Sequence, residues 1–172
     1  MDLSSYIRDI PDFPKKGILY KDITTLLGDQ SAYTEIVNQL FNRHKNNSID
    51  KVVGIESRGF IFGASLATRL GCAFVPIRKP NKLPYKVYSK EYDLEYGTDT
   101  LEIHIDAIKK KDRVVLIDDV LATGGTASAA IDLLERFDCS LIECLFIIEI
   151  VTLKGFSKII DKKKSFFSFI KS

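Results

Sequence analysis

The sequence has few of the side chains on which many catalytic and metal sites depend. Its two histidines, His44 and His104, fall in different predicted elements, which argues against a zinc site and against a histidine-based triad. Its three cysteines, Cys72, Cys139 and Cys144, are odd in number, sit in apolar surroundings and lack metal-ligand spacing. We expect them to be core thiols in a reducing compartment. Any catalysis must then use carboxylate, lysine, arginine or tyrosine side chains.

Long apolar runs and an excess of one charge are also missing. No stretch of the 172 residues reaches the length of a membrane span, and the first ten residues contain acidic side chains but no apolar signal segment. A formal net charge of +2 is too small for a chain that binds nucleic acid through a basic field. We therefore expect a soluble, cytoplasmic protein that binds neither membranes nor nucleic acid.

Apolar periodicity predicts an α/β fold in a single domain that spans residues 1–172. Short apolar runs alternate with helical patterns along the chain, which is typical of a mostly parallel sheet flanked by helices. Such sheets bind their ligands at the carboxyl ends of the strands. The expected strands are residues 51–55, 73–77, 114–117 and 140–150, and the expected helices are residues 31–43, 61–70 and 126–137.

The remaining segments carry weaker patterns. Apolar and polar side chains alternate over residues 100–105, which predicts a half-exposed antiparallel ribbon together with residues 92–96. Residues 154–172 are expected to form a solvated turn and a last edge strand. At the other end of the chain, about fifty residues are expected to precede the first strand.

Residues 114–130 carry the clearest chemical signal in the sequence. Their first four, 114–117, form an apolar run typical of a parallel strand covered on both faces. Gly124 and Gly125 permit a tight turn that a ligand can approach closely, and helical apolar spacing starts at Thr126. The turn therefore presents a helix N-terminus, whose free N–H groups and positive dipole end suit a phosphate monoester.

Two carboxylates, Asp118 and Asp119, stand between that strand and the turn. Beside a phosphate they would repel it, so they need another partner. The vicinal hydroxyls of a ribose, which donate hydrogen bonds, or a divalent cation would satisfy them. The residues by themselves indicate a sugar-phosphate site, and the absence of a Walker A sequence argues against a P-loop ATPase.

The whole string resembles the phosphoribosyl pyrophosphate (PRPP) motif of the type I phosphoribosyltransferases. The resemblance implies that Asp118 and Asp119 hold the ribose 2′ and 3′ hydroxyls of PRPP. It implies a central sheet of the kind already predicted, with a small hood and a flexible antiparallel lid ribbon. It assigns the 5′-phosphate to the following loop, which consists of Ala122, Thr123, Gly124, Gly125 and Thr126.

Four further segments narrow the resemblance to the adenine phosphoribosyltransferases. Residues 13–23, 54–60, 78–84 and 92–97 match that family in its own order, and the resemblance covers about residues 10–169. It implies transfer of ribose 5-phosphate from PRPP to adenine, which gives AMP and pyrophosphate in purine salvage. It also implies Mg²⁺ as the cofactor, held mainly through PRPP near the paired aspartates, and a homodimer as the assembly.

The resemblance assigns the pyrophosphate of PRPP to the turn after the first strand. Ser57, Arg58 and Gly59 supply backbone amides and a guanidinium there, and these groups suit pyrophosphate oxygens. A cis peptide is implied at Glu56–Ser57. A predicted lid loop, which begins at residue 78 and reaches about residue 90, adds two basic side chains. The set expected to neutralise the departing pyrophosphate is Arg58, Lys79, Lys82 and Mg²⁺.

The purine is assigned to two other segments. Leu19, Tyr20 and Lys21 form part of the adenine pocket in the resemblance. Glu95 is the candidate acid/base at purine N7, with Tyr96 supporting or closing the site, and Arg58 is the second catalytic candidate. Lys21 stands where the family usually has arginine, so the charge is kept and the planar fork is lost.

Two alternative functions stay open at this point. An enzyme of the same class could act on an oxopurine such as hypoxanthine, guanine or xanthine, which the segments at residues 13–23 and 92–97 disfavour. A non-catalytic PRPP-sensing regulator could keep the same motif without turnover. Repressors of that sort carry an added DNA-binding module, and no helix-turn-helix pattern or basic face is visible in the first fifty or so residues.

Overall fold

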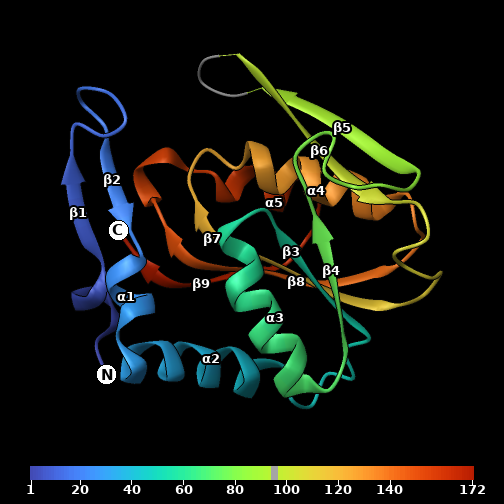
Figure 1. Cartoon of the computed structure of the whole chain (residues 1–172), viewed down its shortest axis with the longest axis horizontal. Helices are drawn as coiled ribbons and strands as arrows, with labels where there is room; N and C mark the ends of the chain where they lie inside the picture. Colours follow the sequence, from blue (N-terminus) through green and yellow to red (C-terminus); the bar gives the residue numbers. More distant parts are fainter. Residues whose placement is uncertain (94–96) are drawn as a thin grey trace. The chain divides into compact units, whose positions relative to one another are not determined.

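The computed structural model describes residues 1–93 and 97–172 (Figure 1). The chain divides into two compact units, Met1–Arg43 and His44–Ser172. None of the helices in the described part of the chain has the length and apolar character needed to cross a lipid bilayer.

The first unit contains a small antiparallel sheet and most of a long helix. The predicted helix at residues 31–43 is confirmed as α2. The prediction that no strand occurs in the first fifty residues is wrong, because β1 and β2 pair there. Their side chains are exposed or half-buried, so no apolar alternation marks them in the sequence. The elements are the 3₁₀ turn η1 (Leu3–Tyr6), β1 (Arg8–Pro11), β2 (Leu19–Asp22), α1 (Thr24–Gly28) and α2 (Gln30–His44).

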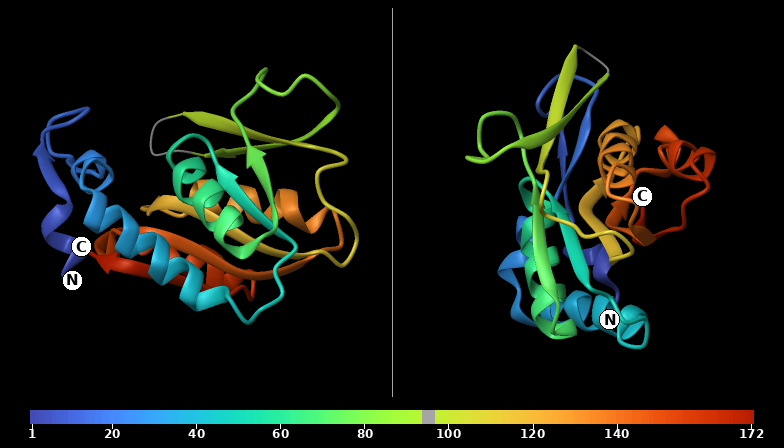
Figure 2. Two further views of the ribbon diagram at one scale, coloured as in Figure 1. Left: turned by 60° about the horizontal axis from the view of Figure 1, so that its bottom comes forward. Right: turned by 90° about the vertical axis from the view of Figure 1, so that its right-hand side faces the viewer.

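The second unit is built around a five-stranded parallel sheet in the order β4-β3-β7-β8-β9. Figure 2 shows α3 on one face of this sheet and α4 and α5 on the other. This arrangement confirms the predicted sheet flanked by helices. The strands are β3 (Lys51–Ile55), β4 (Ala73–Ile77), β7 (Arg113–Leu121), β8 (Ser140–Glu149) and β9 (Phe166–Lys171), and the helices are α3 (Arg58–Leu70), α4 (Gly125–Glu135) and α5 (Phe156–Asp161).

Strand β7 is longer than the sequence predicts. Its pairing with β3 ends at Gly54 and Ile117, where the apolar run stops. The longer strand β8 continues to pair with β7 as far as Leu121 and Glu149. Asp118 and Asp119 therefore lie within β7, beyond its pairing with β3, and not after the strand. From Asp118 onward, this edge of β7 has no strand pairing with β3.

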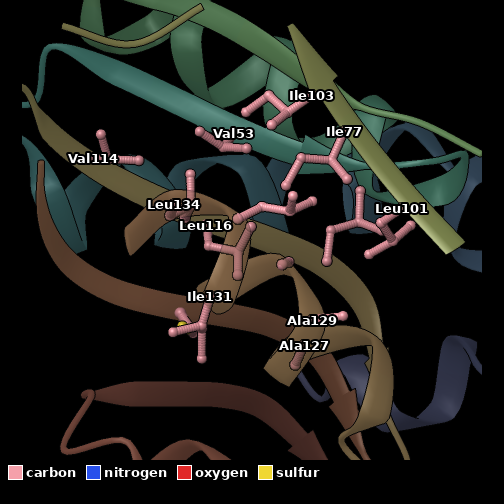
Figure 3. Close-up of a cluster of buried hydrophobic side chains, with 14 of the residues drawn as sticks. Val53, Ile77, Leu101, Ile103, Val114, Leu116, Ala127, Ala129, Ile131 and Leu134 are labelled. Carbon is pink, nitrogen blue, oxygen red and sulfur yellow. The ribbon is translucent and has the colours of Figure 1, made fainter. Parts of the chain in front are cut away.

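An antiparallel ribbon, β5 (Val87–Asp93) with β6 (Thr98–His104), is the other sheet of the second unit. The predicted alternation is confirmed over residues 100–103, because Leu101 and Ile103 are fully buried while Thr100 and Glu102 are half-buried; Ile105 lies past the end of β6 and is only half-buried. Strand β5 starts within the segment predicted as a lid loop, so that loop is shorter than expected. The buried side of the ribbon belongs to the same core as Val53, Leu116 and Ile131 (Figure 3).

Two further predictions need correction, one about the end of the chain and one about the cysteines. Strand β9 is the expected edge strand, but helix α5 occupies much of the segment from residue 154 to β9 that was expected to be a solvated turn, and the 3₁₀ turn η2 (Val151–Leu153) lies just before that segment. Helix α5 has six residues, of which Ile159 is buried. Six residues are too few to show a helical period in the sequence. Of the three predicted core thiols, only Cys144 is buried, and burial raises the pKa of its thiol to about 12.

Candidate active site

The candidate site lies in the second unit, where three strands of the parallel sheet end. Residues 56–59 follow β3, residues 78–82 follow β4, and residues 122–126 follow β7. Carboxyl ends of parallel strands meet at one edge of a sheet, where α/β proteins bind their ligands. The structure therefore gathers the predicted pyrophosphate, lid and phosphate segments on one edge of a single sheet.

The turn after β3 approaches β7 very closely. The Glu56–Ser57 peptide is cis, as the resemblance implies, and Arg58 is the first residue of α3. A Cβ atom on Gly59 would lie 2.8 Å from the carbonyl oxygen of Ile117 and 3.1 Å from Oδ1 of Asp118. Only glycine fits between α3 and β7 without a shift of the backbone. The pyrophosphate turn and the paired aspartates are in this way held against each other.

Arg58 is the charged group that faces the paired aspartates. Its Nε lies 2.7 Å from Oδ2 of Asp119, whose side chain is 5% exposed. Burial raises the pKa of Asp118 well above its ordinary range, and the neighbouring Asp119 charge adds to the effect. Burial also raises the pKa of Asp119, although Arg58 opposes the increase. One guanidinium thus faces two crowded carboxyl groups, which remain suited to hydroxyl donors or to a further cation.

Glu56 organises the lid loop and is a residue that the sequence analysis missed. Its nearly buried carboxylate accepts hydrogen bonds from Nε and Nη2 of Arg78, both at 3.3 Å, and from the Lys79 amide at 2.8 Å. Lys82 Nζ donates to the same carboxylate. Burial alone would raise the pKa of Glu56, but these bonds outweigh it and lower the pKa to about 2. Glu56 therefore stays charged and fixes the loop that carries Lys79 and Lys82.

The phosphate loop before α4 depends on close packing between glycines. Gly124 has φ +76°, a left-handed conformation that favours glycine, and a Cβ there would lie 2.3 Å from the Gly155 carbonyl oxygen. A Cβ on Gly155 would in turn lie 2.1 Å from the carbonyl oxygen of Ala122. The segment before α5 thus packs closely against the phosphate loop. Gly155 is a second position that the sequence analysis missed. The sequence feature that could have indicated Gly155 is a single glycine in a segment expected to be a solvated turn.

The remaining predicted residues are placed as follows. Lys79 contacts the ribbon through Tyr92 and Asp99, two residues that the sequence analysis did not select. Glu95 and Tyr96 lie outside the described residues. The predicted adenine-pocket residues are consecutive on β2 in the first unit, and they are Leu19, Tyr20 and Lys21.

Within the first unit, two of these residues have defined partners. The Tyr20 ring meets the Phe13 ring edge to face, with 5.1 Å between the centroids. Lys21 Nζ lies 2.8 Å from Oδ1 of Asp9 on the paired strand β1. Leu19 is half exposed, and so is Phe13, which presents a second aromatic surface beside Tyr20. Phe13 was not selected from the sequence, although it begins the segment that carried the resemblance.

The comparisons with known proteins agree with this geometry. A family model described as a phosphoribosyl transferase domain matches residues 23–170, which defines the class as phosphoribosyltransferases. An adenine phosphoribosyltransferase of Citrifermentans bemidjiense is 58% identical over 162 residues, which cover 94% of this chain and 95% of that relative. The chain belongs to the adenine phosphoribosyltransferase family.

Solved structures of that family share the fold over nearly the whole chain. The crystal structure of adenine phosphoribosyltransferase from Thermoanaerobacter pseudethanolicus matches with a TM-score of 0.94 and 46% identity, covering 99% of this chain and 98% of that one. The enzyme from Saccharomyces cerevisiae, complexed with an imino-altritol bisphosphate and adenine, matches with a TM-score of 0.91 and 37% identity. That match covers 98% of this chain and 96% of the yeast chain.

Proposed function

We propose that the carboxyl edge of the five-stranded sheet is where this chain binds PRPP and carries out its reaction. As an adenine phosphoribosyltransferase, the chain transfers ribose 5-phosphate from PRPP to adenine and forms AMP and pyrophosphate, a reaction of purine salvage. The single observation that supports this location most strongly is the 2.7 Å contact between Arg58 and Asp119. It joins the turn assigned to pyrophosphate with the carboxylates assigned to ribose.

The reaction needs charge stabilisation at two places at once. As pyrophosphate leaves C1′ of the ribose, positive charge develops on the sugar and negative charge on the leaving group. Arg58, Lys79 and Lys82 neutralise the pyrophosphate, while backbone amides of Ser57 and Gly59 bind its oxygens. Each of these three cations already faces a carboxylate, so pyrophosphate binding replaces or shares an existing ion pair.

The ribose and its 5′-phosphate are held by the elements around β7. Asp118 and Asp119 accept hydrogen bonds from the 2′ and 3′ hydroxyls and keep C1′ in line with the incoming base. The 5′-phosphate binds at the N-terminus of α4, where free amides and the helix dipole favour an anion. The residues that form that cradle are Ala122, Thr123, Gly124, Gly125 and Thr126.

The residues assigned to binding and activating the purine do not belong to the turns that follow β3, β4 and β7. Leu19, Tyr20 and Lys21 form part of the adenine pocket, with the Tyr20 ring as a stacking surface. Glu95 exchanges a proton with purine N7, and Tyr96 supports it. A Giardia lamblia relative, 41% identical, was solved with 9-deazaadenine, which supports a purine as the acceptor. The relatives compared above are named as adenine phosphoribosyltransferases, which does not favour an oxopurine enzyme or a non-catalytic sensor.

The donor set at the paired aspartates fits Mg²⁺. Asp118 and Asp119 offer carboxylate oxygens that Arg58 only partly neutralises. No group of three or more potential metal-ligating side chains occurs in the described ranges, so PRPP and water must supply most ligands, as Mg²⁺ prefers. When bound, Mg²⁺ neutralises charge on the departing pyrophosphate.

The assembly, the domain organisation and the cellular location are further parts of the proposal. The family match runs from residue 23 to 170 across the boundary between the two units, which supports one phosphoribosyltransferase domain over 1–172. We infer a homodimer from the family resemblance. The three cysteines are free thiols, which suits the reducing cytoplasm.

Asp118→Asn tests the assignment of the ribose hydroxyls. The substitution keeps the shape and removes the charged acceptor, so PRPP affinity is expected to fall about 10- to 100-fold. Pyrophosphate has no ribose and should bind at least as tightly as before, because a nearby negative charge is gone. Isothermal titration calorimetry with PRPP and with pyrophosphate separates the two effects.

A matched control is Asp106→Asn, which alters an exposed carboxylate in the same way. It should leave both affinities unchanged. An equal loss for PRPP and pyrophosphate in Asp118→Asn, or no loss for PRPP, would contradict the ribose role.

A further inference from the structure

The ammonium group of Lys79 is held by two residues that face each other across the ribbon. Lys79 Nζ donates a hydrogen bond of 3.0 Å to Oη of Tyr92 and forms an ion pair with Oδ2 of Asp99. Tyr92 and Asp99 are register partners in the β5–β6 pair. Lysine has a long, flexible stem, so two fixed contacts at its end restrict it substantially.

The two ribbon residues are themselves fixed. Tyr92 Oη donates to Oδ2 of Asp99 at 3.3 Å, and the amide of Thr100 donates to Oδ1 of Asp99 at 2.7 Å. Tyr92 is 9% exposed and belongs to the main hydrophobic core. A Cβ on Gly125 would meet Cδ2 of this ring at 3.4 Å, so the ring lies directly against the first turn of α4.

The Tyr92 hydroxyl also reaches the phosphate loop. Thr126 Oγ1 lies 3.3 Å from the same Oη atom that Lys79 contacts. One hydroxyl therefore touches a residue assigned to pyrophosphate and a residue assigned to the 5′-phosphate, the two ends of PRPP. Lys79 and Thr126 are far apart in the chain, and Tyr92 comes from a third element.

Charge and proton placement agree with this arrangement. Burial alone would lower the pKa of Lys79, but the hydrogen bonds with Asp99 and Tyr92 outweigh it and raise the pKa. Burial would raise the pKa of Asp99, and the bond from Lys79 reverses this. Lys79 and Asp99 are therefore both charged near neutral pH, and the Tyr92 hydroxyl contacts both of them.

We propose that Tyr92, oriented by Asp99, is a positioning residue that sets Lys79 and Thr126 at a fixed separation for the two ends of PRPP. This inference rests on the proposed pyrophosphate role of Lys79. Tyr92 touches no reacting atom in this scheme and acts through Lys79 and Thr126. Its contribution is greatest when charge develops on the leaving pyrophosphate, because Lys79 must then be in place.

Tyr92→Phe is the direct test, since it removes the hydroxyl and keeps the core ring. A hydrogen bond to a charged group corresponds to a change of about 10- to 100-fold, and we expect kcat to fall within that range. The KM for PRPP should rise less than kcat falls, and the KM for adenine should stay unchanged. Steady-state kinetics with each substrate varied in turn measures all three, and thermal unfolding verifies that the variant folds.

A double-mutant cycle with Lys79→Ala distinguishes positioning from a general structural effect. If Tyr92 acts through Lys79, then Tyr92→Phe should change kcat much less in the Lys79→Ala background than in the wild type. The matched control is Tyr88→Phe on the same strand, where the ring packs against Phe137 and the hydroxyl has no hydrogen bond among the described residues. It should leave kcat unchanged.

Each result that disagrees with these expectations would overturn a different part of the proposal. Full activity of Lys79→Ala would remove Lys79 from the reaction and overturn the proposed function at that residue, and the inference with it. A large effect of Lys79→Ala with wild-type kinetics for Tyr92→Phe would overturn the positioning role alone. Additive effects of the two substitutions would do the same, because they would show that Tyr92 acts independently of Lys79.

Discussion

Replacing Arg58 with glutamine is expected to lower kcat by about 10²- to 10³-fold, the usual cost of losing one group aimed at developing charge. Arg58 supplies the guanidinium closest to the paired aspartates, 2.7 Å from Asp119. Without it, the leaving pyrophosphate loses a cation, and a nearly buried carboxylate loses its counter-charge. The raised pKa values of Asp118 and Asp119 should then rise further. Steady-state turnover with saturating adenine and PRPP measures the effect.

Arg69→Gln is the matched control for that substitution. Arg69 lies in the last turn of the same helix, about 16 Å along the axis from Arg58, and is exposed. It should retain wild-type turnover, so a decrease in Arg58→Gln cannot be attributed to a general loss of charge on α3. Turnover of Arg58→Gln within a factor of two of the wild type would contradict the role of Arg58 at the pyrophosphate.

Glu95→Gln is expected to lower kcat by about 10²- to 10⁴-fold, which is the range for loss of a positioned acid or base. The reason is that glutamine cannot exchange a proton with purine N7. PRPP affinity should change little, because the carboxylate is assigned to the base and not to the sugar phosphate. Single-turnover rates with preformed PRPP complex, together with calorimetric PRPP affinities, measure both quantities.

An exposed glutamate four residues earlier provides the comparison for Glu95. Glu91 lies on β5, and Glu91→Gln makes the same chemical change on the solvent-facing side of the ribbon. Its kcat is expected to equal that of the wild type. A wild-type rate in Glu95→Gln would exclude Glu95 from the proton transfer, and an equal decrease in both variants would show that the effect is not specific to Glu95.

The sequence was sufficient for the parts of the fold whose burial is periodic. Strands β3 and β4 have the predicted bounds, and the helix before β3 differs from its prediction by one residue at each end. The ribbon was visible because Leu101 and Ile103 alternate with more polar neighbours and enter the core. Each of these elements buries a regular set of side chains, and regular burial is what a sequence pattern records.

Elements with little regular burial were missed for the same reason. All side chains of strands β1 and β2 are exposed or half-buried, and helix α5 is too short to show a period. The extension of β7 beyond its apolar run depends on pairing with β8, which places Asp118 opposite Phe146. Pairing between distant segments is a tertiary property, so composition near Asp118 could not indicate it.

The candidate site likewise contains residues that local sequence motifs indicated and residues that only tertiary contacts reveal. Arg58, Asp118 and Asp119 were selected from local motifs, and the structure brings Arg58 against Asp119. Glu56 and Tyr92 were not selected, because their importance comes from contacts with Lys82 and Lys79 across many residues of chain. A carboxylate that binds a loop and a tyrosine within a ribbon look ordinary in sequence. Their roles become visible only from the distances between elements.

The central claim is that the chain transfers ribose 5-phosphate to a 6-aminopurine at the carboxyl ends of its parallel strands. Its most direct test is to incubate the purified chain with PRPP and Mg²⁺ and with adenine, hypoxanthine, guanine or xanthine in separate reactions, measuring nucleotide and pyrophosphate by chromatography. We expect AMP and pyrophosphate in equal amounts from adenine, and no nucleotide from the oxopurines. Turnover with an oxopurine alone, or PRPP binding without any turnover, would contradict the claim.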